Sequence, residues 1–303
     1  MPAAGKLRID STVPAYSGEV NNYRLALSTL FVFLEACGGQ APAGRPWPIQ
    51  YREESRLNPP LLLHIATVDL TDPRVAIRVV RGGEDPDGPG EWQTKLDTVR
   101  NMATKASLDL AINGDYFDGK EAMMLMGRRI PYIPGNWAKV MGWAMSDGVL
   151  WSKSPSEAVL AVDQQGKVTI VPGQALPDGS VQAIGGAHVA VNHGRKRIFP
   201  PAAPSLTARS GAGVNQQGTR LFLLVVDGKQ DDSVGMTLEE FDAELVKLGC
   251  YHAIALDGGG SSTLVVRRTQ GQPLELVSRP SDGAGQRPGL ERSVANALGV
   301  VVR

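Results

Sequence analysis

The stretch that most constrains the fold is residues 254–266, IALDGGGSSTLVV, where two apolar runs flank a turn of small residues. Short apolar runs bounded by turn residues are typical of buried strands or strand ends. Three consecutive glycines without a Cβ let the backbone adopt positive φ and approach a ligand closely: Gly258, Gly259 and Gly260. The pattern therefore predicts that Asp257 lies at a strand end and faces a turn whose amides are open.

Three hydroxyl side chains follow the glycines and add hydrogen-bond donors beside those amides: Ser261, Ser262 and Thr263. A carboxylate aimed across a donor-rich turn suits chemistry on a phosphate or a sugar. The alternative is a tight hairpin in which the aspartate and the serines only close the turn. Residues 254–266 taken alone leave both interpretations open.

Length and charge limit the class of protein. A chain of 303 residues is long enough to bury a large core, and one α/β or α+β domain can reach this size. The 31 basic residues balance the 31 acidic ones, so we expect no nucleic-acid partner and no polybasic membrane surface. The 35 glycines and 21 prolines indicate many turns and short elements.

The two cysteines, Cys37 and Cys250, form no C-x-x-C motif, so neither a zinc knuckle nor a redox pair is favoured. An apolar run at residues 25–34, LALSTLFVFL, has about the length of a signal-peptide core. The LEACG sequence at its end resembles a bacterial lipoprotein cleavage box with Cys37 as the lipidated residue, although Glu35 fits such a box poorly. The alternative is an N-terminal amphipathic helix packed on the domain.

These features predict an extracytoplasmic protein, in the periplasm, in the cell envelope or secreted, with a lipid anchor at Cys37 as one option. The apolar run is too short to span a bilayer, so we expect no transmembrane helix in the mature protein. Residues 38–48, GGQAPAGRPWP, have the composition of a linker. We therefore predict a leader-like segment and linker over residues 1–48 and one folded domain over residues 49–303.

The apolar patterns of that domain predict the α+β class, with a multi-stranded mixed β-sheet core and few helices. Strands are expected at residues 61–68, 74–80, 110–112, 159–162, 168–171, 183–194 and 221–226, and helices at residues 94–105 and 237–248. Thr237 and Glu240 form a capping box at the start of the second helix, and Gly249 ends it. His64, inside the first strand, is more typical of a satisfied core residue than of a ligand.

Three motifs place polar side chains at predicted strand ends. In residues 110–118, LAINGDYFD, Asn113 offers an amide and Asp115 a carboxylate, and Gly114 allows close approach; the alternative is an Asn-Gly hairpin turn. Asp227 follows the strand at residues 221–226 as Asp257 follows its own. If those two strands are parallel, both carboxylates lie at the same edge of the sheet.

Arg209, in the sequence PSLTARSG, is a further candidate because a guanidinium suits two-pronged contact with phosphate or carboxylate. The alternative is an exposed loop arginine. His188 and His193 have no partners at metal-ligand spacing, so no zinc site is predicted.

The combination of motifs is more specific than any one of them. Along the chain they read NGDYF, a Gly-Gly strand, TARSG, LLVVDG, SVGMTLEEF, LDGGGSST, RPSDG and ERSVANALGV. This series resembles the phosphodiester glycosidase family over residues 61–303. Two departures are Tyr116 before Phe117 in the aromatic pair and an insert-like segment at residues 122–151, which leaves pocket shape and substrate length open.

The resemblance implies a hydrolase that cleaves a sugar-1-phosphodiester, on an N-acetylhexosamine-containing or envelope glycan of bacteria. Breaking a glycosyl–phosphate bond needs cationic or amide donors on the phosphate, and Arg209 and the amides of residues 258–261 are candidates. It also needs a carboxylate that activates water or stabilises an oxocarbenium-like centre. Asp257 and Asp227 are candidates for that role, with Asp115 in reserve.

The resemblance also implies substrate-binding residues around these groups: Asn113 (for a sugar hydroxyl), Gly114, Asp115, Gly258, Gly259, Gly260, Ser261, Ser262, Arg292 and Asn296. For Arg292 and Asn296, in ERSVAN, the alternative is an ordinary loop-to-strand junction. We expect Asn113, Arg209, Asp227 and Asp257 to converge on one cleft with residues 258–260 as its floor.

Two other functions fit the same motifs. The first is a non-catalytic glycan-binding module of the cell envelope built on the same fold. The second is a metal-dependent phosphodiesterase in which the acidic residues hold a divalent cation, although no clustered His/Asp ligand set accompanies them.

Overall fold

The structure is a computed structural model that describes residues 45–120, 123–125, 128–130, 132–200, 203, 205–283 and 290–303. Pro46–Arg303 forms one compact unit. The leader-like run and Cys37 lie outside the described residues, so the leader and the lipid anchor stay predictions. Within the described ranges, neither helix has the length and apolarity that crossing a bilayer requires.

The largest element of the unit is a seven-stranded sheet with the order β1-β2-β18-β17-β19-β15-β16. Its strands are β1 (Ile49–Leu57), β2 (Pro60–Asp69), β18 (Arg220–Val226), β17 (Arg209–Val214), β19 (His252–Ala255), β15 (His188–Asn192) and β16 (Arg195–Lys196). The central strand β17 runs antiparallel to both of its neighbours. Strands β18 and β19 are therefore parallel to each other, and both end at the same edge of the sheet.

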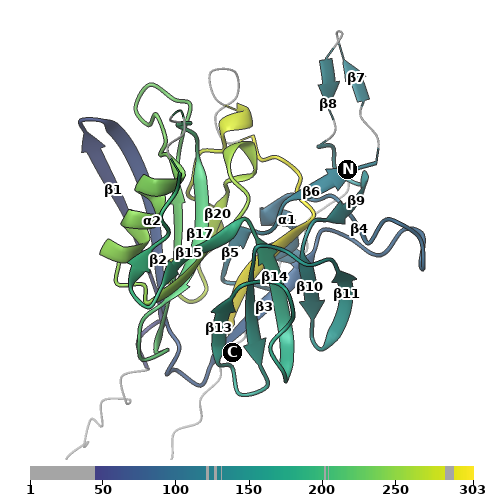
Figure 1. Cartoon of the computed structure of the whole chain (residues 1–303), viewed down its shortest axis with the longest axis horizontal. Helices are drawn as coiled ribbons and strands as arrows, with labels where there is room; N and C mark the ends of the chain where they lie inside the picture. The colour runs from purple at the N-terminus through teal and green to yellow at the C-terminus, as the bar shows by residue number, and fades with distance from the viewer. Residues whose placement is uncertain are drawn as a thin grey trace, which may run out of the picture. The chain divides into compact units, whose positions relative to one another are not determined.

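Two five-stranded sheets complete the core. One has the order β21-β20-β5-β22-β3, from β21 (Glu275–Leu276), β20 (Leu264–Val266), β5 (Leu110–Asn113), β22 (Asn296–Val302) and β3 (Val75–Arg81). The other has the order β11-β10-β14-β12-β13, from β11 (Val149–Lys153), β10 (Trp143–Ser146), β14 (Ser180–Gly186), β12 (Ala158–Asp163) and β13 (Val168–Val171). The largest apolar cluster joins side chains from all three sheets, so the main core lies where they meet (Figure 1).

Two smaller sheets of the described residues lie outside these three. They are a three-stranded sheet of β4 (Thr94–Lys95), β9 (Trp137–Val140) and β6 (Phe117–Gly119), and a pair formed by β7 (Met123–Leu125) and β8 (Arg128–Ile130). All strand pairs within the described residues are antiparallel, whereas the sequence predicted a mixed sheet.

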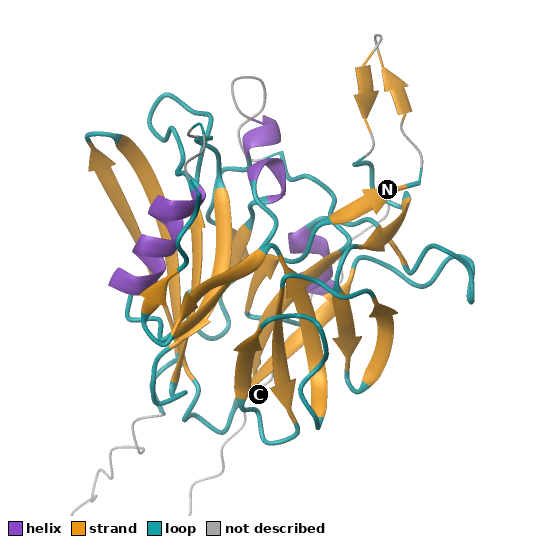
Figure 2. Cartoon of the chain, in the orientation of Figure 1, coloured by secondary structure: helices purple, strands orange, loops and turns teal. Residues whose placement is uncertain are grey.

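The described residues contain two α-helices, α1 (Val99–Lys105) and α2 (Leu238–Lys247), and two short 3-10 segments, Gly259–Ser261 and Ser281–Gly283 (Figure 2). Helix α2 buries Phe241 and Leu245 against one face of the seven-stranded sheet. It begins with the predicted capping box, in which Thr237 accepts a hydrogen bond from the Glu240 amide and the Glu240 side chain accepts one from the Thr237 amide. The prediction of an α+β domain with few helices is confirmed.

Two element predictions differ from the structure. The helix expected at residues 94–105 begins five residues later, because Thr94–Lys95 pairs with β9 and Thr98 is the residue that caps the helix. The single strand expected at residues 183–194 is two strands, β14 and β15, in different sheets. Gly185 and Gly186 end the first of them where the chain crosses between sheets.

Candidate active site

Asn113, the last residue of β5, is fully buried and holds the turn that carries Asp257. Its Nδ2 donates to the backbone oxygen of Asp257 at 2.7 Å, and its Oδ1 accepts from the backbone amide of Thr263 at 3.1 Å. Both ends of its amide are thereby occupied. The structure does not support the expected contact between Asn113 and a sugar hydroxyl, nor an Asn-Gly hairpin, since β5 pairs with β20 and β22.

The glycine turn itself is a short 3-10 segment, Gly259–Ser261, with Gly259 at a φ of 61°. The Gly259 amide donates to the Ala208 oxygen at 2.8 Å and the Ser261 amide donates to the Gly258 oxygen at 3.3 Å. These amides are used within the fold, so the expectation that they are open to a phosphate is not met for them. The Oγ of Ser262 is buried without a hydrogen-bond partner among the described residues.

Asp257 follows β19 and is only 8% exposed. Burial raises the pKa of its carboxyl group to about 6, although the Ser261 hydroxyl, the positive charge of Arg292 and the Gly258 amide act in the opposite direction. Its backbone amide donates to the Gly114 oxygen at 3.0 Å, which fixes the turn against the residue after β5. Asp257 is therefore a largely desolvated carboxylate that is still ionised at neutral pH.

Arg292 lies beside Asp257 and is held by Asp282. Its Nε and Nη2 donate to the two carboxylate oxygens of Asp282 at 2.7 and 2.8 Å, and its Nη1 lies 3.4 Å from the Oγ of Ser261. The guanidinium also stacks over the Tyr132 ring at 4.0 Å. A Cβ at Gly260 would overlap both Asp282 and Arg292, which explains why the third residue of the turn is glycine.

Arg209 begins β17 and approaches the same turn from another side. Its Nε donates to the Met236 oxygen at 2.9 Å and its Nη2 donates to the Ser205 oxygen at 2.8 Å, whereas its Nη1 has no partner among the described residues. A Cβ built on Gly258 would lie 3.9 Å from that Nη1. Burial lowers the pKa of this guanidinium.

Tyr116 connects these groups, because burial and the charges of Asp257 and Asp115 raise the pKa of its phenol while the charge of Arg209 lowers it. The ring is 38% exposed, which makes it the most accessible member of the group. Tyr116 and Arg292 thus act on Asp257, and Arg209 acts on Tyr116 and lies next to Gly258, so these four residues are neighbours around the glycine turn. We call these four residues the charged cluster.

Asp115 lies under the charged cluster, only 3% exposed. Its Oδ1 accepts from the Tyr116 amide at 2.8 Å, and its Oδ2 lies against Gly142 and Gly185 without a hydrogen bond of regular geometry among the described residues. Burial raises the pKa of this carboxyl group to about 7; the Tyr116 and Gly142 amides oppose the rise and the charge of Asp257 adds to it. A Cβ at Gly142 or Gly185 would overlap Oδ2, so both positions require glycine.

Gly114 and Asn296 form the joint between β5 and β22. The Gly114 amide donates to the Asn296 backbone oxygen at 3.0 Å, and the Asp115 amide donates to the Asn296 Oδ1 at 2.9 Å. A Cβ on Gly114 would overlap the Asn296 side chain. The Nδ2 of Asn296 is buried without a partner among the described residues. These two residues build the floor under Asp115 and Tyr116.

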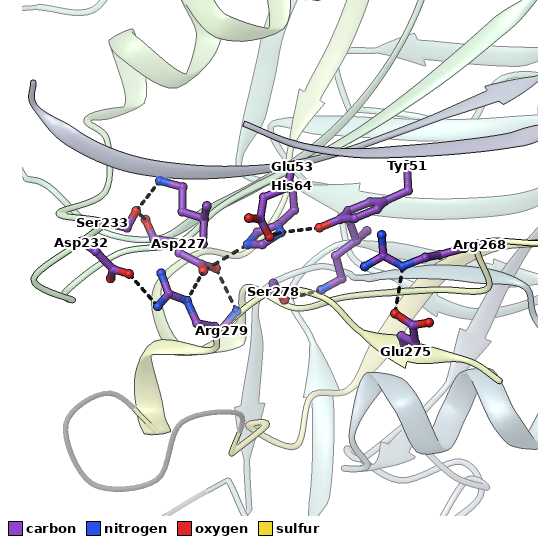
Figure 3. Close-up of polar contacts among 12 residues, drawn as sticks. Tyr51, Glu53, His64, Asp227, Asp232, Ser233, Arg268, Glu275, Ser278 and Arg279 are labelled. Carbon is purple, nitrogen blue, oxygen red and sulfur yellow. Dashed lines mark hydrogen bonds and ion pairs between the residues drawn. The ribbon is translucent and has the colours of Figure 1, made fainter. Parts of the chain in front are cut away.

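Asp227 is the one predicted catalytic residue that the structure does not bring into the charged cluster. Arg209 lies directly opposite Val226 in the β17–β18 pair, so these two side chains share one face of the sheet. Successive side chains along a strand point to opposite faces, so Asp227, the residue after Val226, points to the other face. Both of its carboxylate oxygens are occupied, by His64 and by Arg279 (Figure 3). Of the four residues expected to converge, the structure brings Arg209 and Asp257 to one turn, with Asn113 behind it, but not Asp227.

Two residues beside the charged cluster were not predicted from the sequence. Asp282 lies in the RPSDG motif and Tyr132 in the insert-like segment, and the pairing of both with Arg292 gave no local signal. His64 was predicted as a satisfied core residue, and the structure shows it fully buried with a partner at each ring nitrogen. The described residues contain no group of three or more His, Cys, Asp or Glu side chains placed to hold a metal ion.

The chain is similar to known proteins in sequence. Residues 106–301 match the family model described as "Phosphodiester glycosidase". The bovine (Bos taurus) N-acetylglucosamine-1-phosphodiester alpha-N-acetylglucosaminidase is 29% identical over 218 residues, covering 65% of this chain and 38% of the relative, and the human (Homo sapiens) protein of the same name is 28% identical with the same coverage. The chain thus spans less than half the length of these curated relatives.

The fold is also similar to solved structures. The catalytic domain of the zebrafish N-acetylglucosamine-1-phosphodiester alpha-N-acetylglucosaminidase superposes with a TM-score of 0.61 at 22% identity, covering 84% of this chain and 82% of that one. A hypothetical protein from Synechocystis superposes with a TM-score of 0.53 at 15% identity, covering 84% and 62% respectively. At such identities the likeness concerns the fold.

Proposed function

The chain belongs to the phosphodiester glycosidase family, and we propose that its compact unit hydrolyses the bond between a sugar and a phosphodiester at the anomeric oxygen. The observation that carries this proposal is the position of Asp257, a carboxylate with a pKa near 6 that feels the charge of Arg292 and lies on a turn whose Gly258 is next to Arg209. Such an arrangement offers positive charge to a phosphate and a base or stabilising charge to the sugar carbon in one place.

The phosphate end of the substrate is assigned to the two arginines. The Nη1 of Arg209 is free of partners among the described residues, while its other two nitrogens are held by backbone oxygens. The donor is therefore aimed before the substrate arrives, which lowers the entropy cost of binding. Arg292 is fixed in the same way by Asp282, and its charge adds to the attraction for an anion.

The sugar end is assigned to Asp257 and Tyr116. Phosphate leaves readily as an anion, so the reaction depends little on protonation of the leaving group. Asp257, ionised above its pKa of about 6, then either activates water or stabilises the positive charge that develops at the anomeric carbon. Tyr116, 38% exposed, offers a hydroxyl and a ring face to the sugar.

The substrate that we propose is an N-acetylhexosamine-1-phosphodiester on an envelope glycan. The names of the bovine and human relatives support the N-acetylglucosamine part. The envelope location rests on the leader-like sequence before residue 45, and an extracytoplasmic, lipid-anchored protein stays a proposal.

The test is to incubate the protein with a panel of sugar-1-phosphodiesters, including a nucleotide sugar, and to measure free sugar. Release of N-acetylhexosamine at a rate that depends on Asp257 supports the proposal. Binding of the same compounds without any release would instead favour the glycan-binding module. Release that is abolished by a chelator would favour the metal-dependent phosphodiesterase.

A further inference from the structure

Asp227 holds both the main chain and the side chain of Arg279. Its Oδ1 accepts from the Arg279 backbone amide at 3.0 Å, and its Oδ2 accepts from the Arg279 Nε at 3.2 Å (Figure 3). The Nε2 of Gln230 donates to the Arg279 backbone oxygen at 2.8 Å. Arg279 is therefore fixed through its amide, its carbonyl and its guanidinium at once.

His64 in turn fixes the Asp227 carboxylate. The imidazole is fully buried, with Nε2 3.1 Å from the Asp227 Oδ2 and Nδ1 2.9 Å from the Tyr51 hydroxyl. The Ser233 hydroxyl donates to the Asp227 backbone oxygen at 2.7 Å. Because every polar atom of Asp227 has a partner in a buried network, its carboxylate has one orientation.

The segment that Asp227 anchors also carries a partner of the charged cluster. Three residues after Arg279, Asp282 accepts the two-pronged ion pair from Arg292 at 2.7 and 2.8 Å. Arg292 reaches from there to the Ser261 hydroxyl in the glycine turn. A continuous chain of contacts thus runs from the buried His64 to the group beside Asp257.

We propose that Asp227 is a positioning residue: it anchors residues 279–282 so that Asp282 keeps Arg292 against the glycine turn beside Asp257. The inference rests on the hydrolase function proposed above, for which Arg292 binds the phosphate. It replaces a catalytic role for Asp227, whose carboxylate faces Arg279 and His64 rather than the charged cluster.

The position of Arg292 has a measurable consequence at Asp257. The positive charge of Arg292 lowers the pKa of the Asp257 carboxyl group, and it is the charged residue that acts most directly on it. The other groups that face Asp257 are the Ser261 hydroxyl and the Gly258 amide on its own turn, Tyr116 and Asp115 after β5, and Arg209 on β17 through its contact with Tyr116. If the anchor loosens and Arg292 moves away, the Asp257 titration should move to higher pH.

The experiment compares Asp227→Asn with Asp232→Asn. Both carboxylates pair with Arg279, but Asp232 is exposed and contacts only its outer nitrogen, so it is the matched control. We expect Asp227→Asn to raise KM for a sugar-1-phosphodiester about tenfold with kcat within about threefold of the parent, because a loosened Arg292 weakens binding of the phosphate. We expect Asp232→Asn to change neither.

A second measurement does not depend on turnover. The Asp257 carboxyl titration, followed by 13C NMR and assigned with Asp257→Asn, should move to higher pH in Asp227→Asn and in Asp282→Asn. The double variant should move no further than either single variant, because both break the same chain. If the parent protein is inactive, the proposed hydrolase function is overturned. The Asp257 titration can still be measured in that case, and it still tests whether Asp227 anchors residues 279–282.

Two results would overturn the inference. One is an Asp257 titration and a KM in Asp227→Asn that match those of Asp232→Asn. The other is a kcat that falls to background in Asp227→Asn with the titration unchanged, which would return Asp227 to a catalytic role. If Asp227→Asn does not fold, Arg279→Gln, which keeps the Asp227–His64 contact, is judged by the same two readouts.

Discussion

The side-chain amide of Asn113 donates a 2.7 Å hydrogen bond to the backbone oxygen of Asp257, joining residues 144 positions apart in the sequence. The same side chain accepts a hydrogen bond from Thr263 at the other end of the turn. One buried side chain thus closes the loop that carries the proposed catalytic carboxylate. The position of Asp257 therefore depends on a residue that is itself fully buried.

Asn113→Asp should destabilise the unit and weaken activity together. The substitution keeps the size of the side chain but replaces the Nδ2 donor by a carboxylate oxygen. This oxygen then faces the Asp257 backbone oxygen, so two buried acceptors lie together and the hydrogen bond is lost. We expect a loss of about 1–3 kcal/mol in the free energy of unfolding, measured by denaturant titration. Asn192→Asp, at an exposed position of β15, is the control and should change little. Equal stability of the two variants would contradict the role given to Asn113.

The sequence predicted correctly those helices and strands that depend on residues close together in the chain. The capping box of Thr237 and Glu240 lies within four residues, and α2 starts where it predicts. The strands at residues 159–162 and 168–171 pair as a hairpin around a turn of polar residues and glycine. By contrast, both Thr94 and Thr98 can begin a helix, and only the pairing of Thr94 with β9 decides between them.

The sequence predicted only part of the candidate site, because the rest depends on contacts between residues far apart in the chain. Asp257 and Arg209 were chosen from residue type and neighbouring glycines, and the structure places both at one turn. Asp227 has the same Asp-Gly signal, but the alternation of β18 turns it to the other face, where His64 and Arg279 occupy it. The ion pair of Asp282 with Arg292 could not be read from the sequence, since neither motif marks the other as its partner.

Asp257→Asn should remove most of the activity while keeping the fold. The variant retains the size and the backbone contacts of the residue but not the charge that activates water or stabilises the anomeric carbon. We expect kcat to fall by about a hundredfold or more. Free sugar released from a sugar-1-phosphodiester measures it, with the exposed Asp178→Asn as control. Turnover of Asp257→Asn within a few-fold of the parent would refute the assignment.

Arg209→Lys should cost activity although it preserves the positive charge. The guanidinium spends two nitrogens on the oxygens of Met236 and Ser205 and keeps Nη1 for the phosphate, and a single ammonium group cannot do all three. We expect kcat/KM to fall at least about tenfold, mainly through KM. Arg197→Lys, in an exposed ion pair with Glu157, is the matched control. Equal kinetics for both variants would rule out the phosphate role of Arg209.

The rate should depend on pH through Asp257. Because the working form is the carboxylate and the pKa is about 6, kcat/KM should decline as the pH falls below about 6, while a phosphodiester does not titrate in this range. Arg292 lowers this pKa, so Arg292→Gln should move the acid limb to higher pH. A pH–rate profile between about pH 4.5 and 8 measures both. An acid limb that stays in place in Arg292→Gln would contradict the contact.

Asp115→Asn should become more stable relative to the parent as the pH rises. Burial raises the pKa of Asp115 in the folded protein to about 7, above its unfolded value of 3.8, so the folded state binds the proton more tightly. The parent therefore loses stability as the pH rises from about 4 through 7, and a neutral asparagine does not. Each pKa unit corresponds to about 1.4 kcal/mol, so the shift of roughly three units predicts that the variant gains on the order of 4 kcal/mol relative to the parent between pH 4 and 8. Thermal unfolding across this range measures the difference, with the exposed Asp178→Asn as control. A difference between variant and parent that is the same at pH 4 and pH 8 would show that folding does not raise the pKa of Asp115.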